Sequence, residues 1–172
     1  MRLIKKFKIS IFFINSILLT LLAGKMPKKR LCHKKWPYKE GKWEKDGKLY
    51  EKIFSVKKWK NLLPELSDFI KSAFSKRHLK QCTEEYLASF LTESCRSEFT
   101  HWCIIFSTAV FFIWGDLLTG IKMALLAIAL NLPYIIIQRY NRPRITRLLR
   151  KIQAEKIFTG LSLERNIQKQ AG

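Results

Sequence analysis

Acidic residues are scarce in this sequence: 13 Asp and Glu stand against 33 Lys and Arg, which gives a net charge of +20 over 172 residues. Histidine is scarcer still, with 3 residues, and the 4 cysteines form no CxxC pair and have no histidine at zinc-ligand spacing. A chain of this length leaves no room for a multidomain soluble enzyme. We therefore expect one structural unit with no metal site and no cofactor.

The cysteines, Cys32, Cys82, Cys95 and Cys103, are expected to be free thiols. Cys95 and Cys103 fall eight positions apart in one predicted helix. Their Cα atoms would then be about 12 Å apart, which is beyond the reach of a disulfide.

Hydrophobic residues make up 48% of the chain, and they are separated from the charges along the sequence. Such segregation is typical of a membrane protein. Nucleic-acid binding is the other usual explanation of strong positive charge, but a nucleic-acid-binding domain does not need apolar runs long enough to enter a bilayer. We expect an integral, anchored or multi-pass protein of the cell membrane, in contact with membrane lipid and without a nucleic-acid partner.

Residues 1–24 combine a basic stretch with an apolar run from Ile9 to Gly24. This pattern is typical of either a signal peptide or a membrane anchor. Cleavage after Gly24 would put Leu22 at the third-last position, where a small residue is preferred, so we favour an uncleaved anchor.

Residues 25–98 form a polar region with 19 Lys and Arg and 10 Asp and Glu. Within it, Asp46 and Gly47 are typical of a two-residue turn. That turn would place Trp43 opposite Tyr50 as an aromatic cross-strand pair, which predicts a short β-hairpin.

Residues 99–137 are predicted to form a transmembrane helical hairpin. Thr83, followed by two glutamates, is typical of a helix N-cap, and no Pro or Gly occurs from there to Trp114. This helix becomes apolar in its second half, and a second apolar stretch follows residues 115–116. Pro133 is expected to kink the second helix.

Residues 138–172 form a basic tail. Its apolar side chains recur at the spacing of one helix face, so we predict an amphipathic helix that lies along the membrane surface. The residues of that face are Ile145, Leu148, Leu149 and Ile152.

The fold class expected is mainly α, with an N-terminal anchor, a transmembrane hairpin, an interfacial helix and a possible short β-hairpin. Positive charge favours the cytoplasm for both the tail and the polar region, which leaves the basic N-terminus outside. Either the first segment is inverted against this rule, or it is half-inserted or re-entrant, or residues 99–137 cross the membrane only once.

His101 lies where the polar helix enters the apolar run. Glu98 precedes it by three residues on the same helix face, and Glu93 lies at the edge of that face. A carboxylate beside an imidazole fixes its tautomer and increases its basicity, which suits removal of a proton from a hydroxyl. We predict His101 as a general base oriented by Glu98 or Glu93. The alternative is a polar helix end at headgroup depth.

Other charged side chains allow two interpretations. His78 is the reserve candidate for the base, although its setting is also typical of a solvated loop. Arg139, Arg142 and Arg144 are either snorkelling residues or a phosphate clamp for acyl-CoA. The run 57–60, which contains Lys58 and Trp59, allows the same two interpretations.

Several short motifs occur one after another over most of the chain, and the most specific is QRYNRPR at Gln138–Arg144. The others are Glu44–Lys45, Gly47–Lys48, Val56 with Lys58–Trp59–Lys60, Arg77–His78–Leu79, Glu93 with Arg96, Glu98, His101–Trp102, Asn131 and Pro133. Together they resemble the glycosyl-4,4'-diaponeurosporenoate acyltransferases, small membrane enzymes of staphyloxanthin-type carotenoid synthesis.

The resemblance implies transfer of a fatty acyl group, with acyl-CoA as the expected co-substrate, to a sugar hydroxyl of a glycosylated carotenoid or another glycolipid. Such a reaction needs a base for the hydroxyl and a site for the charge of the donor. We predict His101, with Glu98, as that base. The residues predicted to bind substrate are Lys58, Trp59, Arg77, Arg96, Trp102, Asn131, Arg139, Arg142 and Arg144.

The chain lacks a Gly-x-Ser-x-Gly elbow, so direct transfer is favoured over an acyl-serine intermediate. An acyl-thioester on Cys95 or Cys103 is disfavoured because apolar surroundings raise the pKa of a thiol. The competing hypothesis is a non-catalytic membrane scaffold or lipid-binding partner, in which the same polar face packs against another helix.

Overall fold

The computed structural model describes residues 2–65, 68 and 82–170, with side chains for 7–65, 68 and 82–159. This part of the chain is mainly helical, as predicted, and contains no strand. The helices are α1 (Arg2–Gly24), α2 (Lys48–Phe54), α3 (Val56–Trp59), α5 (Glu84–Ser107), α6 (Val110–Ile113) and α7 (Leu117–Gln170), with 3-10 turns η1 (Lys28–Arg30) and η2 (Lys42–Glu44).

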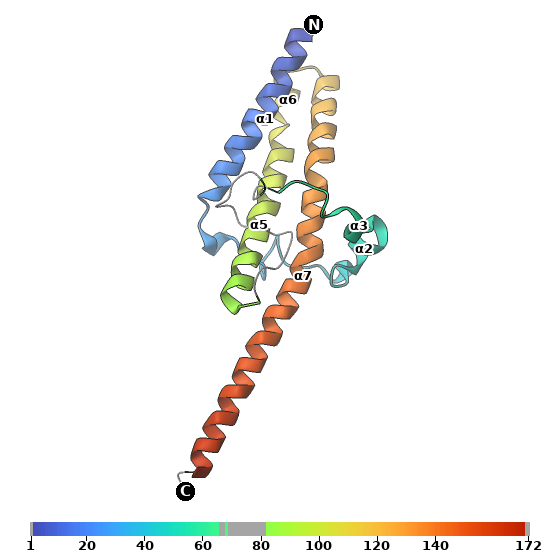
Figure 1. Ribbon diagram of the computed structural model, residues 1–172. Coiled ribbons are helices and arrows are strands. Elements are labelled where there is room, and N and C mark those ends of the chain that lie inside the picture. The colour runs from blue at the N-terminus through green and yellow to red at the C-terminus, as the bar shows by residue number, and fades with distance from the viewer. Residues whose placement is uncertain (1, 66–67, 69–81, 171–172) are drawn as a thin grey trace.

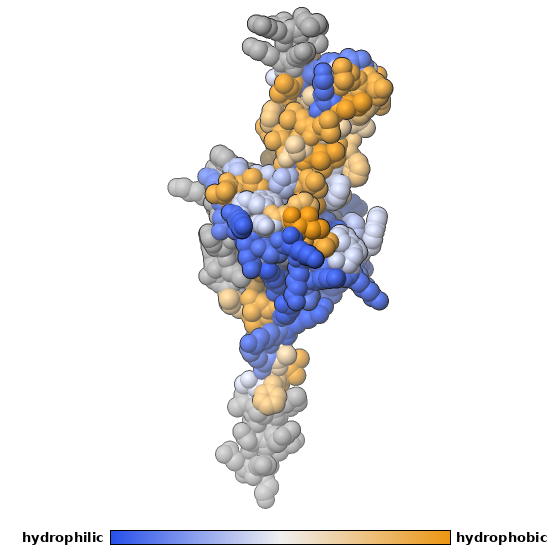
Figure 2. Space-filling view, turned by 90° about the vertical axis from the view of Figure 1, so that its right-hand side faces the viewer, coloured by the Kyte–Doolittle hydropathy of each residue, from blue (hydrophilic) through white to orange (hydrophobic). Residues whose placement is uncertain are grey.

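Three apolar segments lie side by side at one end of the molecule: α1, the second half of α5 with α6, and the first half of α7 (Figure 1). Their shared core is a cluster of Phe12, Ile104, Phe111, Met123 and Ala127. The N-terminus lies at the same end as the α6–α7 connection. On the face shown in Figure 2, hydrophobic side chains predominate at this end, and a hydrophilic belt follows below it.

Two described helices are long and apolar enough to cross a membrane by length and composition, namely α1 over Phe7–Gly24 and α7 over Leu117–Thr159. The outward side chains of α1 are exposed, including Ile14 and Leu21. An exposed apolar surface of this extent is unfavourable in water.

Thr83 caps α5, as predicted, and its hydroxyl oxygen accepts a hydrogen bond from the backbone N–H of Tyr86 at 3.3 Å. The prediction of one helix as far as Trp114 is wrong, because α5 ends at Ser107. There the Ser107 and Thr108 hydroxyls donate to the carbonyls of Ile104 and Ile105 at 2.8 and 2.6 Å. Hydroxyls that bond nearby carbonyls compete with the regular helical pattern.

The tail is not a separate interfacial helix. It continues α7 without interruption through Pro133 and Pro143. Its apolar residues Ile145 and Leu149 are buried against the first half of α5, in a cluster with Leu87, Phe90 and Leu91. The spacing correctly predicted one apolar face, and that face packs against a protein helix.

The predicted β-hairpin is wrong, since η2 and α2 occupy its place. The Trp43 and Tyr50 rings still meet edge to face, with centroids 6.2 Å apart. The turn also exists, with φ of 57° at Asp46 and 78° at Gly47. It joins η2 to α2. A helix is favoured after the turn because the buried side chain of Tyr50 packs against α7, in a hydrophobic cluster with Val56 and Tyr140.

We predict that Gly47→Ala destabilises the protein by about 2 kcal/mol. Gly47 has a left-handed φ, and an added Cβ would lie 2.8 Å from the backbone oxygen of Tyr140 on α7. The measurement is the unfolding midpoint in detergent. Gly24→Ala is the matched control, because its Cβ would meet nothing within 4 Å. Equal midpoints for the two variants would contradict a tight approach of this turn to α7.

Candidate active site at the α5–α7 interface

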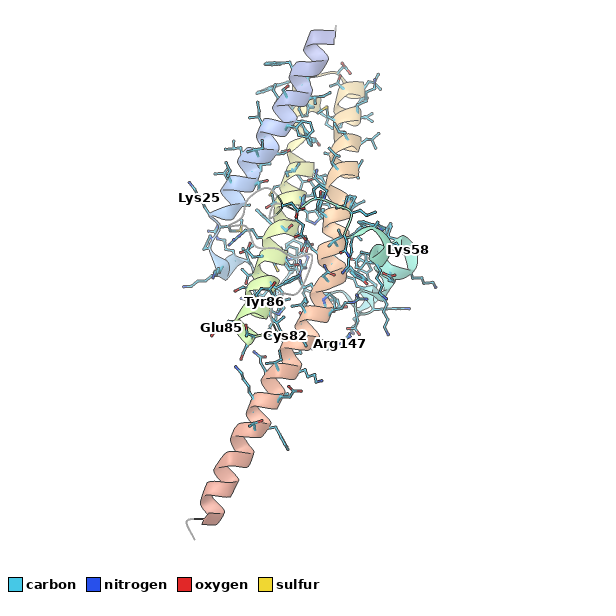
Figure 3. The ribbon with its side chains drawn as sticks, in the orientation of Figure 1. Lys25, Lys58, Cys82, Glu85, Tyr86 and Arg147 are labelled. Carbon is cyan, nitrogen blue, oxygen red and sulfur yellow. The ribbon has the colours of Figure 1, made fainter. Side chains whose placement is uncertain are left out.

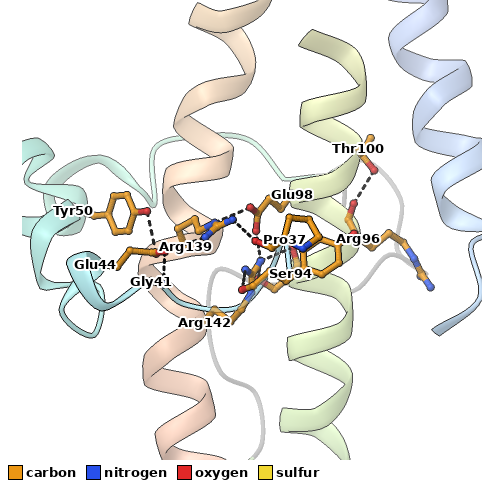
Figure 4. A network of polar contacts seen from close by, with 11 residues as sticks. Pro37, Gly41, Glu44, Tyr50, Ser94, Arg96, Glu98, Thr100, Arg139 and Arg142 are labelled. Carbon is orange, nitrogen blue, oxygen red and sulfur yellow. Dashed lines mark hydrogen bonds and ion pairs between the residues drawn. The ribbon is translucent and has the colours of Figure 1, made fainter. Parts of the chain in front are cut away.

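Glu98 lies at the centre of a buried ion-pair cluster between α5 and α7 (Figure 4). Its side chain is 1% exposed. Oε1 accepts a hydrogen bond from Nε of Arg139 at 2.7 Å, and Oε2 accepts one from a terminal guanidinium nitrogen of Arg142 at 2.6 Å. Both carboxylate oxygens of Glu98 are therefore held by arginines of α7.

Glu44 completes this cluster from the segment before α2. Its carboxylate accepts hydrogen bonds from Arg139 at 3.0 Å, from the hydroxyl of Tyr50 at 3.0 Å and from the backbone N–H of Gly41 at 2.9 Å. Burial and the negative charge of Glu44 raise the pKa of Tyr50, so its phenol remains a donor. The two acids and two guanidinium groups have opposite formal charges that cancel, which makes their burial tolerable.

The arginines also bind backbone carbonyls. Arg139 donates to the carbonyl of Pro37 at 2.6 Å, and Arg142 donates to the carbonyl of Tyr38 at 2.9 Å. Burial by itself would lower the pKa of Arg139, but the Glu98 and Glu44 carboxylates outweigh it and raise the pKa. Arg139 and Arg142 therefore connect α7 to α5 and to the segment before α2. The terminal nitrogens of both guanidinium groups already have hydrogen-bond partners, so neither arginine offers a free pair of donors to a phosphate, as the clamp interpretation requires.

His101 contacts Asn131 on α7, with 2.8 Å between Nδ1 and the amide oxygen. Asn131 is buried, and its amide nitrogen donates to the carbonyl of Ala127 at 2.8 Å. This second bond fixes the direction of the amide, so its oxygen faces the imidazole and Nδ1 must carry the proton. In the neutral ring Nε2 is then the basic nitrogen. Asn131 therefore occupies the position beside the ring that we predicted for Glu98.

His101 lies on α5 between polar and apolar surroundings. One turn before it lies Glu98 in the ion-pair cluster, and one turn after it lies Ile104 in the apolar core. Its ring stacks on Tyr134, with centroids 4.8 Å apart and planes within 10°. The Tyr134 hydroxyl donates to the carbonyl of Pro64 at 3.0 Å. A half-buried imidazole therefore lies at the border of the apolar bundle.

The remaining α5 residues that we predicted for the site contact other parts of the structure. Glu93 forms an ion pair with Arg96 at 2.7 Å, and Arg96 also donates to the carbonyl of Met26 at 3.3 Å. This pair ties α5 to the end of α1. Trp102 is exposed and stacks on Phe106, with centroids 5.7 Å apart.

The residues of the basic segments that we predicted to bind substrate have other contacts. Lys58 is exposed on α3, on the far side of the bundle from Lys25 in the view of Figure 3. Trp59 donates to the carbonyl of Phe54 at 2.7 Å. The Arg144 guanidinium lies over the ring of Tyr140, 3.9 Å from its centroid. His78 and Arg77 lie outside the described residues.

Sequence reasoning did not identify Glu44 and Tyr134 as site residues. Glu44 is 95 positions from Arg139, and nothing in its local pattern indicates that it is buried. Tyr134 follows Asn131 by three residues, so the helical spacing could have indicated that both face His101.

Cys95 is expected to resist alkylation at pH 8. It is fully buried beside the ion-pair cluster, and burial raises its pKa to about 11, so the unreactive thiol form dominates. The exposed Cys82 is the internal comparison. Mass spectrometry after iodoacetamide treatment should find label on Cys82 and none on Cys95 until the protein is unfolded. Labelling of both at similar rates would contradict this burial and reopen Cys95 as an acyl carrier.

Comparison with known proteins identifies the family. The family model of the glycosyl-4,4'-diaponeurosporenoate acyltransferases matches residues 34–151. This chain belongs to that family. Proteins of that name from Staphylococcus aureus strains RF122, N315 and USA300 are each 32% identical to it over 156 residues, which is 87% of this chain and 94% of theirs. No solved structure matches the chain.

The glycosyl-4,4'-diaponeurosporenoate acyltransferase family match confirms the resemblance and makes the chain an acyltransferase. The matched range covers the ion-pair cluster, His101 with Asn131, and the groups that stack on Tyr140. It ends at residue 151, within α7.

Proposed function

We propose that this protein transfers a fatty acyl group from acyl-CoA to a sugar hydroxyl of a glycosylated carotenoid ester. Membership of the family supports the reaction class, and the names of the staphylococcal relatives support a glycosyl diaponeurosporenoate as the acceptor. The observation that carries the assignment of the base is the contact of His101 with Asn131, which leaves Nε2 as a proton acceptor.

In this proposal Nε2 of His101 takes the proton of the sugar hydroxyl while the oxygen attacks the acyl carbonyl carbon. The C–O bond of the ester forms and the C–S bond of the thioester breaks. The imidazolium then returns its proton to the leaving thiolate, so free CoA and the ester are the products. Stacking on Tyr134 and the bond to Asn131 hold the ring in one orientation during both proton transfers.

We further propose that the bundle of α1, α5–α6 and the first half of α7 lies in the cell membrane. The apolar surface of this end and the length of α1 and α7 support that placement. The hydrophilic belt of Figure 2 then lies at the cytoplasmic headgroups, and the N-terminus lies on the other side of the membrane. His101 is at the border of belt and bundle, the depth at which a glycolipid holds its sugar.

Purified protein in detergent, given acyl-CoA and a glycosylated carotenoid ester, tests this function. Mass spectrometry should detect the acceptor with one hydroxyl hydrogen replaced by the acyl group, together with an equal amount of free CoA. Absence of any ester with donors of several chain lengths would favour the non-catalytic scaffold instead. A sugar ester formed without release of CoA would contradict the proposed donor.

A further inference from the structure

An apolar groove of about 300 Å³ lies between the α2–α3 segment and α7. Phe54 and Trp59 form one wall, and the other wall is a stripe of α7 that includes Ala129, Pro133 and Ile136. Asn131 and Tyr134, which contact His101, are on a different face of the same helix. The groove is therefore separate from the proposed catalytic site.

Two cations flank the lower end of the groove. Tyr140 follows Ile136 by one helical turn, and the Arg144 guanidinium lies 3.9 Å from the centroid of its ring. The amino group of Lys60 lies 5.6 Å from the same centroid. Within the part of the chain that the structure describes, neither cation has an ion pair, although the charge of Glu51 acts on Lys60. Burial, and after it the charge of Arg144, lowers the pKa of Lys60. An anion bound between Lys60 and Arg144 would raise this pKa again.

The length of the groove fits the part of an acyl chain that lies next to the headgroup. From Ile128 to Ile136 the stripe rises about 12 Å at the helical rise. It passes the level of His101, because Asn131 and Tyr134 lie between these two residues. The cations then fall at the level of the phosphates. An acyl chain in the groove and a phosphate between Lys60 and Arg144 would match both surfaces at once.

We propose that this groove binds one acyl chain of an anionic phospholipid whose phosphate contacts Lys60 and Arg144. The second acyl chain remains in the bilayer. A phospholipid fits better than the acyl donor, because a donor held here would have its carbonyl on the face of α7 that is turned away from His101. This inference uses the membrane placement proposed above and is independent of the acyl-transfer reaction.

Native mass spectrometry of the full chain in neutral detergent tests the site with phosphatidylglycerol and phosphatidylcholine of identical acyl chains. We expect one retained phosphatidylglycerol, bound about tenfold or more tightly than phosphatidylcholine. The double variant Lys60→Gln with Arg144→Gln should bind both lipids equally and weakly. Ala129→Phe, which places a ring in the groove, should weaken retention of both lipids. Arg147→Gln is the matched control, because Arg147 is exposed and pairs with Asp46.

Three results would overturn the site. Equal retention of the two lipids by the unchanged protein would show that Lys60 and Arg144 do not recognise the anionic headgroup. An equal loss of preference in Arg147→Gln and in the double variant would indicate diffuse surface charge. One-for-one displacement of phosphatidylglycerol by acyl-CoA would indicate that the groove binds the acyl donor. Because the assay measures binding without turnover, failure of the acyl-transfer proposal would leave its outcome unchanged.

Discussion

His101→Gln is expected to lower the rate of acyl transfer by about 10²–10⁴-fold, the contribution typical of a general base. Glutamine keeps a polar side chain of similar length near Asn131 but cannot take the proton of a hydroxyl. The rate is measured as ester formed per protein by mass spectrometry, with folding verified by the unfolding midpoint. Thr92→Ala, on the exposed side of the same helix, is the matched control and should keep full activity.

Asn131 supplies a second arm of this test, since it acts through His101. Asn131→Leu removes the acceptor for Nδ1–H and should reduce kcat, whereas Asn131→Asp keeps an acceptor and should retain more activity. A carboxylate at this position stabilises the protonated imidazole, so the acid limb of the pH–rate profile should move to higher pH in the Asp variant. An unchanged profile, or full activity in His101→Gln, would exclude His101 as the base.

Glu98→Ala is expected to destabilise the fold by about 3–5 kcal/mol, the cost typical of breaking a buried ion pair. The change leaves the buried Arg142 and the half-buried Arg139 without the carboxylate that both of them contact. The measurement is the free energy of unfolding in detergent. Arg147→Gln breaks the Arg147–Asp46 pair, whose side chains are 61% and 58% exposed, and should cost less than about 1 kcal/mol.

A double variant separates the charge effect from the loss of packing. Glu98→Leu with Arg142→Met removes one acid and one cation together, so it should recover part of the stability that Glu98→Ala loses. Arg139 keeps its bond to Glu44 in this variant. A cost below about 1 kcal/mol for Glu98→Ala would show that the cluster contributes little to stability.

The predictions that held depend on local spacing. The Thr83 cap was sufficient to place the start of α5, and helical periodicity to predict helical structure after it, because each depends on residues within about one turn of one another. The same spacing correctly grouped Ile145 with Leu149 on one face. It could not identify what covers that face, since membrane lipid and the α5 helix are equally apolar partners.

Long-range pairing explains the failures. A pattern in one helix placed Glu98 beside His101, but the arginines of α7, 41 and 44 positions away, engage the carboxylate instead. Charged partners outcompete a neutral ring for a buried carboxylate because an unpaired buried charge is costly. The turn at Gly47 was predicted from its residues, but Tyr50 packs against α7, which favours a helix over a strand.

The sequence by itself determined a basic, helical chain with apolar runs, the family to which it belongs, and His101 as the candidate base at the polar–apolar border. Only the tertiary structure decided which groups surround that base. Asn131 and Tyr134 come to His101 from α7, and Glu44 joins Glu98 through Arg139. Such contacts depend on how α5 packs against α7, and that packing brings together residues too far apart in sequence for any local pattern to pair.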